Sequence, residues 1–452
     1  MKLKLDTGRE MLSNISDQEK EHVAYLFSQN LADVIEILVT GDPTQYSKYE
    51  QLEKERLNKI REKPDSDPFK LFGLAEIKLQ WAFVKMRFGD ELNAGWNILS
   101  VNKLIEENRS RFPDFLLNNK TYGTVQIIVG SIPSKYRWIL GLFGLKGSVP
   151  EGLTTLSKLQ EHQNIFQLEA SLIANMVAVH LLQEDESKNF EKIFRDHPDN
   201  LLVKYFYSAI LMKHAQSEKA LTSLRQAETL QKGYLDFYFL DYLRAEIHLQ
   251  SGNYDQALLH YNQFIERYQG NNYIKAAYFK IFLCHWLNHE DQLALDKFDL
   301  AKEKGEIISD ADKYANKLLK RNEYPNRLLM KLRLATDGGY FAKAIQLMHE
   351  GEAGKFNNPK DQVEFIYRKA RLFHKQNQQD VAIELYKKTI QDSENSPWYF
   401  APNACLQLGH IYKSKDHRGL AIFYFQKALD YNDHEYKSSI DHKAKSALEE
   451  LK

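Results

Sequence analysis

The stretch that decides the fold reads Ala245-Glu-Ile-His-Leu-Gln-Ser-Gly-Asn-Tyr-Asp-Gln-Ala-Leu-Leu-His-Tyr261. Two small residues, Ala245 and Ala257, stand on either side of Gly252, a residue type that suits a tight turn. We expect the alanines to mark the crossing of two antiparallel helices, because a larger side chain there would force the helices apart. Tyr261 follows Ala257 by four residues, so both lie on one face of the second helix. The stretch therefore predicts a helical hairpin.

The alanine and the bulky residue four positions later recur through the C-terminal half of the chain. The intervals between the six successive alanines are 37, 37, 50, 38 and 39 residues. A near-constant period of this size is typical of stacked helical hairpins. We therefore predict an all-α protein, with a right-handed helical-hairpin solenoid over residues 189–452 and a helical region over residues 1–188. The six pairs are Ala220 and Leu224, Ala257 and Tyr261, Ala294 and Phe298, Ala344 and Met348, Ala382 and Tyr386, and Ala421 and Phe425.

The repeat resembles the tetratricopeptide repeat, and residues 245–261 come close to the consensus of that family. Other units depart from it, because Phe282 and Leu332 stand where a small residue is expected, and the 50-residue interval indicates an insertion or a degenerate hairpin. The resemblance implies a concave groove, lined by the first helix of each hairpin, that holds an extended peptide or a helix of a partner. Two later segments match the consensus in part, namely Ala370…Ala382-x-x-x-Tyr386 and Gly409-x-x-Tyr412…Ala421-x-x-x-Phe425-x-x-Ala428.

A second resemblance takes in the N-terminal region as well. Residues 130–133, 144–147 and 152–153 read Gly-Ser-Ile-Pro, Gly-Leu-Lys-Gly and Gly-Leu, and they precede the helical array. Together with the array they resemble the family that includes the yeast inclusion-body-clearance protein. Residues 434–444 are similar to bacterial proteins of that architecture, and the abundance of Lys, Asn and Tyr suits a Bacteroidetes-like source. That family implies no enzyme chemistry for this chain.

Composition argues against several classes of protein. The 452 residues carry 61 basic and 61 acidic side chains, so the net charge of zero argues against a general binder of nucleic acids or anionic membranes. Two cysteines rule out a disulfide scaffold or a Cys-rich zinc module. The chain has only 11 prolines and 21 glycines, which argues against an all-β fold with frequent turns.

The first residues and the most apolar segments bear on the cellular compartment. Residues 1–9 contain two lysines but no apolar run, which predicts a cytoplasmic protein; if a leader has been removed, the periplasm or cell envelope is the alternative. No stretch approaches the ~18 consecutive apolar residues that span a bilayer. Polar residues and Pro133 separate the apolar segments 125–130 and 138–145. This favours two buried helices joined by a turn over a peripheral membrane hairpin, and the role of residues 123–153 stays open.

No residue pattern indicates catalysis or a bound metal. His285 and His289 have a spacing that can share a metal ion on a helix, with Cys284 beside them, but the glutamate of a His-Glu-x-x-His motif is absent. The chain also lacks a Gly-x-Ser-x-Gly elbow and a Gly-x-x-x-x-Gly-Lys-Ser/Thr phosphate loop. We therefore predict a non-catalytic scaffold without cofactor or metal. The alternatives are an exported cell-envelope scaffold that aids the assembly of envelope components, and an enzyme with its site in residues 68–159.

The inner face of the array is the best candidate for a functional site. By resemblance, its groove positions in the last two clear units form a basic and aromatic strip. Such a strip suits an acidic peptide or a C-terminal carboxylate through charge-assisted hydrogen bonds. A solvated polar face is the alternative, and the aromatic residues of earlier units, Tyr205, Tyr242, Phe279 and Trp286, are more typical of core. The predicted partner-binding residues are Tyr367, Arg371, His374, Lys375, Asn403, His410 and Lys413.

Overall fold

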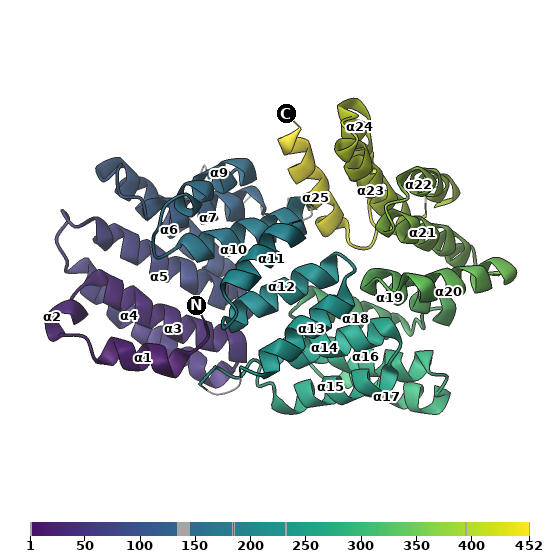
Figure 1. The fold of residues 1–452 in the computed structure, drawn as a ribbon, viewed down its shortest axis with the longest axis horizontal. Helices are drawn as coiled ribbons and strands as arrows, with labels where there is room; N and C mark the ends of the chain where they lie inside the picture. The colour runs from purple at the N-terminus through teal and green to yellow at the C-terminus, as the bar shows by residue number, and fades with distance from the viewer. Residues whose placement is uncertain are drawn as a thin grey trace.

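The computed structural model describes residues 2–132, 145–182, 184, 186–230, 233–393 and 396–451, and within them it is helical with no strand (Figure 1). The all-α prediction is therefore confirmed. The N-terminal region holds α1 (Leu5–Ser13), α2 (Asp17–Lys20), α3 (Val23–Thr40), η1 (Pro43–Gln45), α4 (Tyr46–Arg61), α5 (Pro68–Arg87), α6 (Glu91–Arg111), α7 (Asn118–Gly130), α9 (Val149–Gln160), α10 (Gln167–Val177), the π-helical turn η3 (Ala178–Leu182) and α11 (Ser187–Asp196).

The repeats fold as consecutive helical hairpins, as the alanine spacing predicts. The 50-residue interval is an insertion, because the single helix α18 stands between two hairpins. The hairpins are α12 (Leu201–Lys213) with α13 (Ser217–Glu228), α14 (Phe239–Ser251) with α15 (Tyr254–Arg267), α16 (Ile274–Leu287) with α17 (Asp291–Glu303), α19 (Arg327–Gly338) with α20 (Phe341–Ala353), α21 (Pro359–Lys375) with α22 (Gln379–Ser393), and α23 (Phe400–Ser414) with α24 (Arg418–Asp430). α18 (Asp310–Arg321) follows α17, and α25 (Lys437–Glu450) ends the array.

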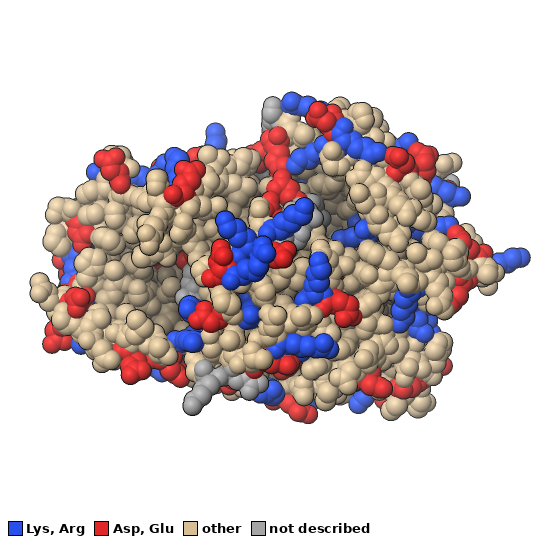
Figure 2. Space-filling model, viewed as in Figure 1, with Lys and Arg blue, Asp and Glu red and all other residues tan. Residues whose placement is uncertain are grey.

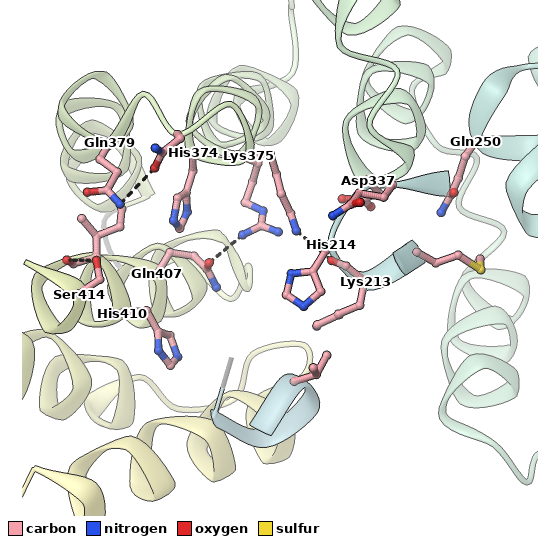
Figure 3. A pocket seen from close by; sticks show the side chains of 16 residues that line it. Lys213, His214, Gln250, Asp337, His374, Lys375, Gln379, Gln407, His410 and Ser414 are labelled. Carbon is pink, nitrogen blue, oxygen red and sulfur yellow. Dashed lines mark hydrogen bonds between the residues drawn. The ribbon is translucent and has the colours of Figure 1, made fainter. Parts of the chain in front are cut away.

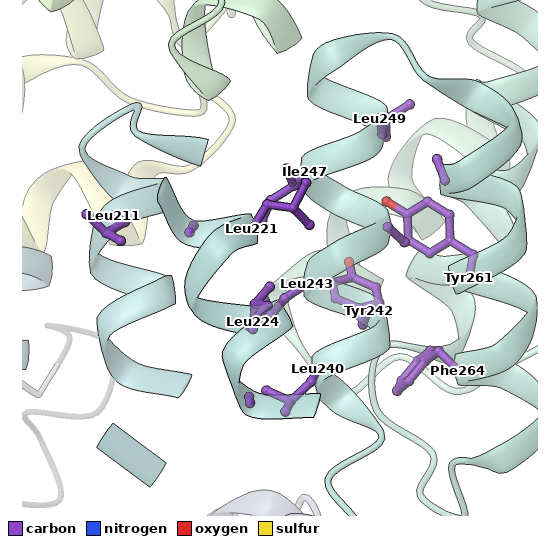
Figure 4. Packing of buried hydrophobic residues seen from close by; sticks show 14 of the residues in the cluster. Leu211, Leu221, Leu224, Leu240, Tyr242, Leu243, Ile247, Leu249, Tyr261 and Phe264 are labelled. Carbon is purple, nitrogen blue, oxygen red and sulfur yellow. The ribbon is translucent and has the colours of Figure 1, made fainter. Parts of the chain in front are cut away.

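The hairpin of α14 and α15 shows why the small residues recur. Ala245 and Ala257 are fully buried, in the same cluster as Tyr261. The ring of Tyr261 lies beside that of Tyr242, with the ring centroids 5.7 Å apart (Figure 4). α14 ends at Gly252, whose φ of 79° lies in the left-handed region that glycine adopts without strain. All six repeat alanines and their six bulky partners are buried. The predicted repeat register is therefore confirmed.

The N-terminal region and the array share one hydrophobic core. Leu3, Val179 and Phe190 pack in the same cluster as Leu201 and the hairpin of α12 and α13. The division of the chain between residues 188 and 189 stays a prediction.

The glycine-rich segment brings α7 and α9 into close contact. A Cβ on Gly152 would lie 2.6 Å from the carbonyl oxygen of Gly123, so neither position has room for a side chain. Val125 and its neighbours in α7 are buried, as the sequence predicts. Most of the second predicted segment, 138–145, lies outside the described residues.

By length and composition alone, α3 is apolar enough to cross a membrane, although it is 44% buried in the fold. It contributes to the core through Val34 and Ile37. It also buries Asp33, which pairs with Arg56 of α4 at 2.6 Å. These contacts are those of a core helix.

The array curls until its later hairpins touch its first ones. Lys375 at the end of α21 donates a hydrogen bond from Nζ to the carbonyl oxygen of Lys213 at the end of α12, at 2.9 Å. The hydroxyl of Tyr340 beside α20 donates to Glu218 of α13 at 2.9 Å. α25 packs against η3 of the N-terminal region (Figure 1). The inner helices of the two ends therefore face one another.

Candidate partner-binding chamber

The curled array encloses a hollow of about 820 Å3 between α12, α19, α21 and α23 (Figure 3). A second hollow of about 220 Å3 shares Lys213, Asp337, Arg371 and Gln407 with the first and extends toward α25. We call the two together the central chamber. Figure 2 shows acidic and basic side chains mixed over one face of the molecule, with a hollow beside α25. The larger hollow is lined by Val179, Met212, Lys213, His214, Gln216, Gln250, Asp337, Arg371, His374, Lys375, Asn377, Gln379, Gln407, His410, Ile411 and Ser414.

Six of the seven predicted partner-binding residues line this chamber. Arg371, His374, Lys375 and His410 line the larger hollow, and Tyr367, Arg371 and Asn403 line the smaller one. Gln407 of α23 extends toward α21 and accepts a hydrogen bond there from Arg371 (Figure 3). Their role in binding stays a prediction.

Lys413 is the predicted residue that the fold does not bring to the chamber. It lies outside the lining of both hollows and forms an ion pair with Glu450 of α25. Tyr367 reaches the chamber but is only 3% exposed, because its ring packs against Tyr399 and Phe400. It therefore contributes more to the core than to a binding surface.

The chamber contains cations that have no carboxylate partner. Lys213, Arg371 and Lys443 form no ion pair among the described residues, and Asp337 is the one carboxylate among the described lining residues. Arg371 is held by Gln407, whose side-chain oxygen accepts a hydrogen bond from Nη1 at 2.7 Å. The described lining of the chamber therefore carries more basic than acidic side chains, although the chain as a whole has zero net charge.

The crowding of these cations changes their protonation. Burial, followed by the charges of Lys443, Arg371 and Lys375, lowers the pKa of Lys213 to about 7. Burial and Arg371 also lower the pKa of Lys443. The chamber thus holds positive charge at a cost that an incoming anion would relieve.

Two histidines of the chamber, His374 and His410, are neutral at physiological pH. Burial, followed by the neighbouring cations, lowers the pKa of His374 and of His410 to about 3. Nδ1 of His374 makes a hydrogen bond with the hydroxyl of Tyr386 at 3.1 Å. Among these predicted residues, the positive charge therefore comes from Arg371 and Lys375, whereas His374 and His410 are uncharged.

Sequence reasoning missed Lys213, Asp337, Gln407 and Lys443. Gln407 follows Asn403 by four residues on α23, so helical spacing was sufficient to find it. The other three reach the chamber only because the array curls and α25 closes its end. The residues next to them in the sequence gave no sign that these three side chains line the chamber. Among the earlier aromatic residues, Tyr242 and Phe279 are buried in hydrophobic clusters.

Two regions that the sequence raised as alternatives contain paired or buried groups. Cys284 is buried, which raises the pKa of its thiol, and His285 makes a hydrogen bond with Glu290. No group of three or more metal-ligating side chains occurs among the described residues.

In residues 68–159, the buried charge of Lys120 is matched by two carboxylates. Its Nζ lies 2.7 Å from Glu76 and 2.9 Å from Glu169 of α10. Burial disfavours the ammonium, but Glu169 and Glu76 outweigh burial and raise the pKa of Lys120. The three residues tie α5, α7 and α10 together, as a structural ion-pair network does.

A family model described as "Tetratricopeptide repeat" matches residues 402–434, which span α23, α24 and the turn after them. This segment is therefore similar to a tetratricopeptide repeat. No curated protein matches the chain. The resemblance to the inclusion-body-clearance family gains no support from these findings and stays a prediction.

Several solved structures are similar to the chain at low identity. The anaphase-promoting-complex hetero-tetramer Cut9-Hcn1 shows 14% identity and a TM-score of 0.29, over 95% of this chain and 85% of that chain. The human IFIT1 dimer with PPP-AAAA shows 13% identity and a TM-score of 0.27, over 89% and 90%. Yeast Tom70 shows 13% identity and a TM-score of 0.25, over 93% and 96%.

Proposed function

We propose that the protein is a non-catalytic interaction scaffold that binds an acidic segment of a partner protein in the central chamber. The observation that carries the proposal is the set of Lys213, Arg371 and Lys443, which line the smaller hollow and have no carboxylate partner among the described residues. The tetratricopeptide segment at residues 402–434 supports a role in protein interaction. The adjoining larger hollow, which Lys213 and Arg371 also line, has a volume of about 820 Å3 and accommodates several residues of an extended peptide.

Binding of an acidic segment would relieve the repulsion between the cations. A carboxylate of the partner would accept hydrogen bonds from the guanidinium of Arg371, which Gln407 already orients. Further acidic side chains would pair with Lys213 and Lys443. Because these groups are half-buried, the pairing is less screened by solvent than it would be on an open surface.

A peptide titration tests the proposal. Fluorescence anisotropy would follow a labelled penta-glutamate peptide and a penta-glutamine peptide of the same length. We expect the glutamate peptide to bind and the glutamine peptide not to bind. The double variant Lys213→Gln with Lys443→Gln should weaken binding at least tenfold. The control variant Lys355→Gln with Lys388→Gln removes the same charge from exposed positions outside the chamber and should bind normally.

Equal binding by both double variants would refute the assignment to the chamber. Circular dichroism of each variant establishes that the helices are intact. A cytoplasmic location remains a prediction, which cell fractionation in the source organism would test.

A further inference from the structure

The basic side chains of the chamber outnumber the charge that a single carboxylate of a bound partner could neutralise. Lys213, Arg371 and Lys443 have no acidic partner among the described residues, and Lys375 stands beside Lys213. Asp337 is the one acid of the described lining, and its nearest ion-pair contact is with Arg333 at 3.6 Å. An occupant with a compact, multiple negative charge therefore fits this lining better than a single carboxylate.

The direction of approach of the cations also distinguishes between anions. Lys213 comes from α12 at the start of the array, Arg371 from α21, and Lys443 from α25 at its end. A carboxylate offers two oxygens in one plane, which suits a single arginine. A phosphoryl group offers three terminal oxygens in tetrahedral directions and about two negative charges, which suits donors that arrive from several helices.

Building on the proposed function, we propose that the acidic segment is phosphorylated and that Lys213, Arg371 and Lys443 bind its phosphoryl group in the central chamber. Gln407 orients the guanidinium of Arg371 for this contact. The neutral imidazoles of His374 and His410 border the same space.

The pH dependence of binding follows from the groups that face Lys213. They are Arg371 and Lys375 from α21, Asp337 from α19, His410 from α23, Lys443 from α25, His180 from η3 and the adjacent His214.

The charges of the phosphoryl group and of Lys213 set the expected pH optimum. A phosphoryl group gains its second charge above about pH 6, and the pKa of Lys213 is about 7, so binding of the phosphorylated peptide should peak between pH 6 and 7. The side chains of a glutamate peptide gain their charge near about pH 4.3, so binding of that peptide should show no rise between pH 5 and 6.

The experiment replaces the central glutamate of the penta-glutamate peptide by phosphoserine. Isothermal titration calorimetry measures the binding of each peptide to the full chain at pH 6.5. A third titration with inorganic phosphate tests whether the site binds the free anion instead of a phosphorylated segment. We expect the phosphoserine peptide to bind at least tenfold more tightly than penta-glutamate. Lys213→Gln with Lys443→Gln should abolish that advantage, whereas Lys355→Gln with Lys388→Gln should keep it.

The outcomes separate this inference from the proposed function. Equal affinity for both peptides would overturn the inference and leave the acidic-segment proposal standing. Absence of binding by either peptide would overturn both. Binding of inorganic phosphate as tight as that of the phosphoserine peptide would assign the site to a free anion and overturn the partner segment as the source. The pH profiles of the two peptides are measured on the unaltered protein, so they test the inference even if a variant fails to fold. A phosphoserine peptide whose binding showed no peak between pH 6 and 7 would overturn it.

Discussion

Removing the ammonium of Lys213 should stabilise the free protein, and the gain should depend on pH. The pKa of this ammonium falls from 10.5 to about 7 in the folded chain. Between these values the unfolded chain binds more protons than the folded chain, so the stability of the parent rises with pH. Below pH 7 the folded chain must carry the proton as well, and its cost is then complete.

The size of the effect follows from the two pKa values. At 1.36 kcal/mol per pKa unit, the depressed pKa of Lys213 costs the folded state roughly 5 kcal/mol at pH 6, where the folded chain carries the proton. The cost is roughly 2 kcal/mol at pH 9, where the folded chain has released the proton and the unfolded chain still binds it. Lys213→Gln removes this cost at both values. The stabilisation by the substitution should therefore be larger at pH 6 than at pH 9, by about 2–3 kcal/mol.

Urea unfolding followed by far-ultraviolet circular dichroism measures this difference at the two pH values. Lys355→Gln, an exposed substitution of the same kind, serves as the control and should change stability little at either pH. If Lys213→Gln changed the free energy of unfolding equally at pH 6 and pH 9, the reasoning about the crowded cations would be refuted.

Three further substitutions test other parts of the structure. Ala257→Leu should overpack the crossing of α14 and α15 and destabilise the chain by roughly 1–3 kcal/mol, so a thermal melt coincident with the parent would contradict the assigned helix crossing. Lys120→Met should cost roughly 3–5 kcal/mol in urea unfolding, because it leaves the buried carboxylate of Glu76 without its cation; an unchanged midpoint would show that the network is not structural. Lys413→Gln should leave peptide affinity within twofold of the parent, since Lys413 is already paired with Glu450 outside the chamber; a tenfold loss would place it in the binding site.

The repeat architecture could be predicted from sequence because close helix packing restricts side-chain size at fixed positions. Ala257 is fully buried, and at Gly409 a Cβ would lie 2.5 Å from the ring of Phe425. Such positions allow only small residues, so they leave a periodic pattern in the sequence. Phe282 and Leu332 depart from that pattern and are nevertheless buried. Phe282 packs in a cluster with Ala294 of its own hairpin, and Leu332 packs in a cluster with Ala344 of its own hairpin.

The chamber could be predicted only in part, because it depends on contacts between distant hairpins. Arg371 and His410 were found from their places on the first helices of neighbouring hairpins. Lys213 and Lys443 come from helices at opposite ends of the array. They meet because the array curls and α25 turns inward, and that curvature accumulates from small rotations between repeats that leave no local signal.

The protonation of Lys213 tests most directly whether the cations converge without a counter-ion. Competitive acylation of the lysines over a pH series, followed by mass spectrometry, measures the pKa of each amine in the intact protein. The crowded chamber predicts half-maximal reactivity of Lys213 near pH 7, about three pH units below an ordinary lysine. Reactivity of Lys213 that rises only near pH 10, together with the lysines of the outer surface, would contradict the account.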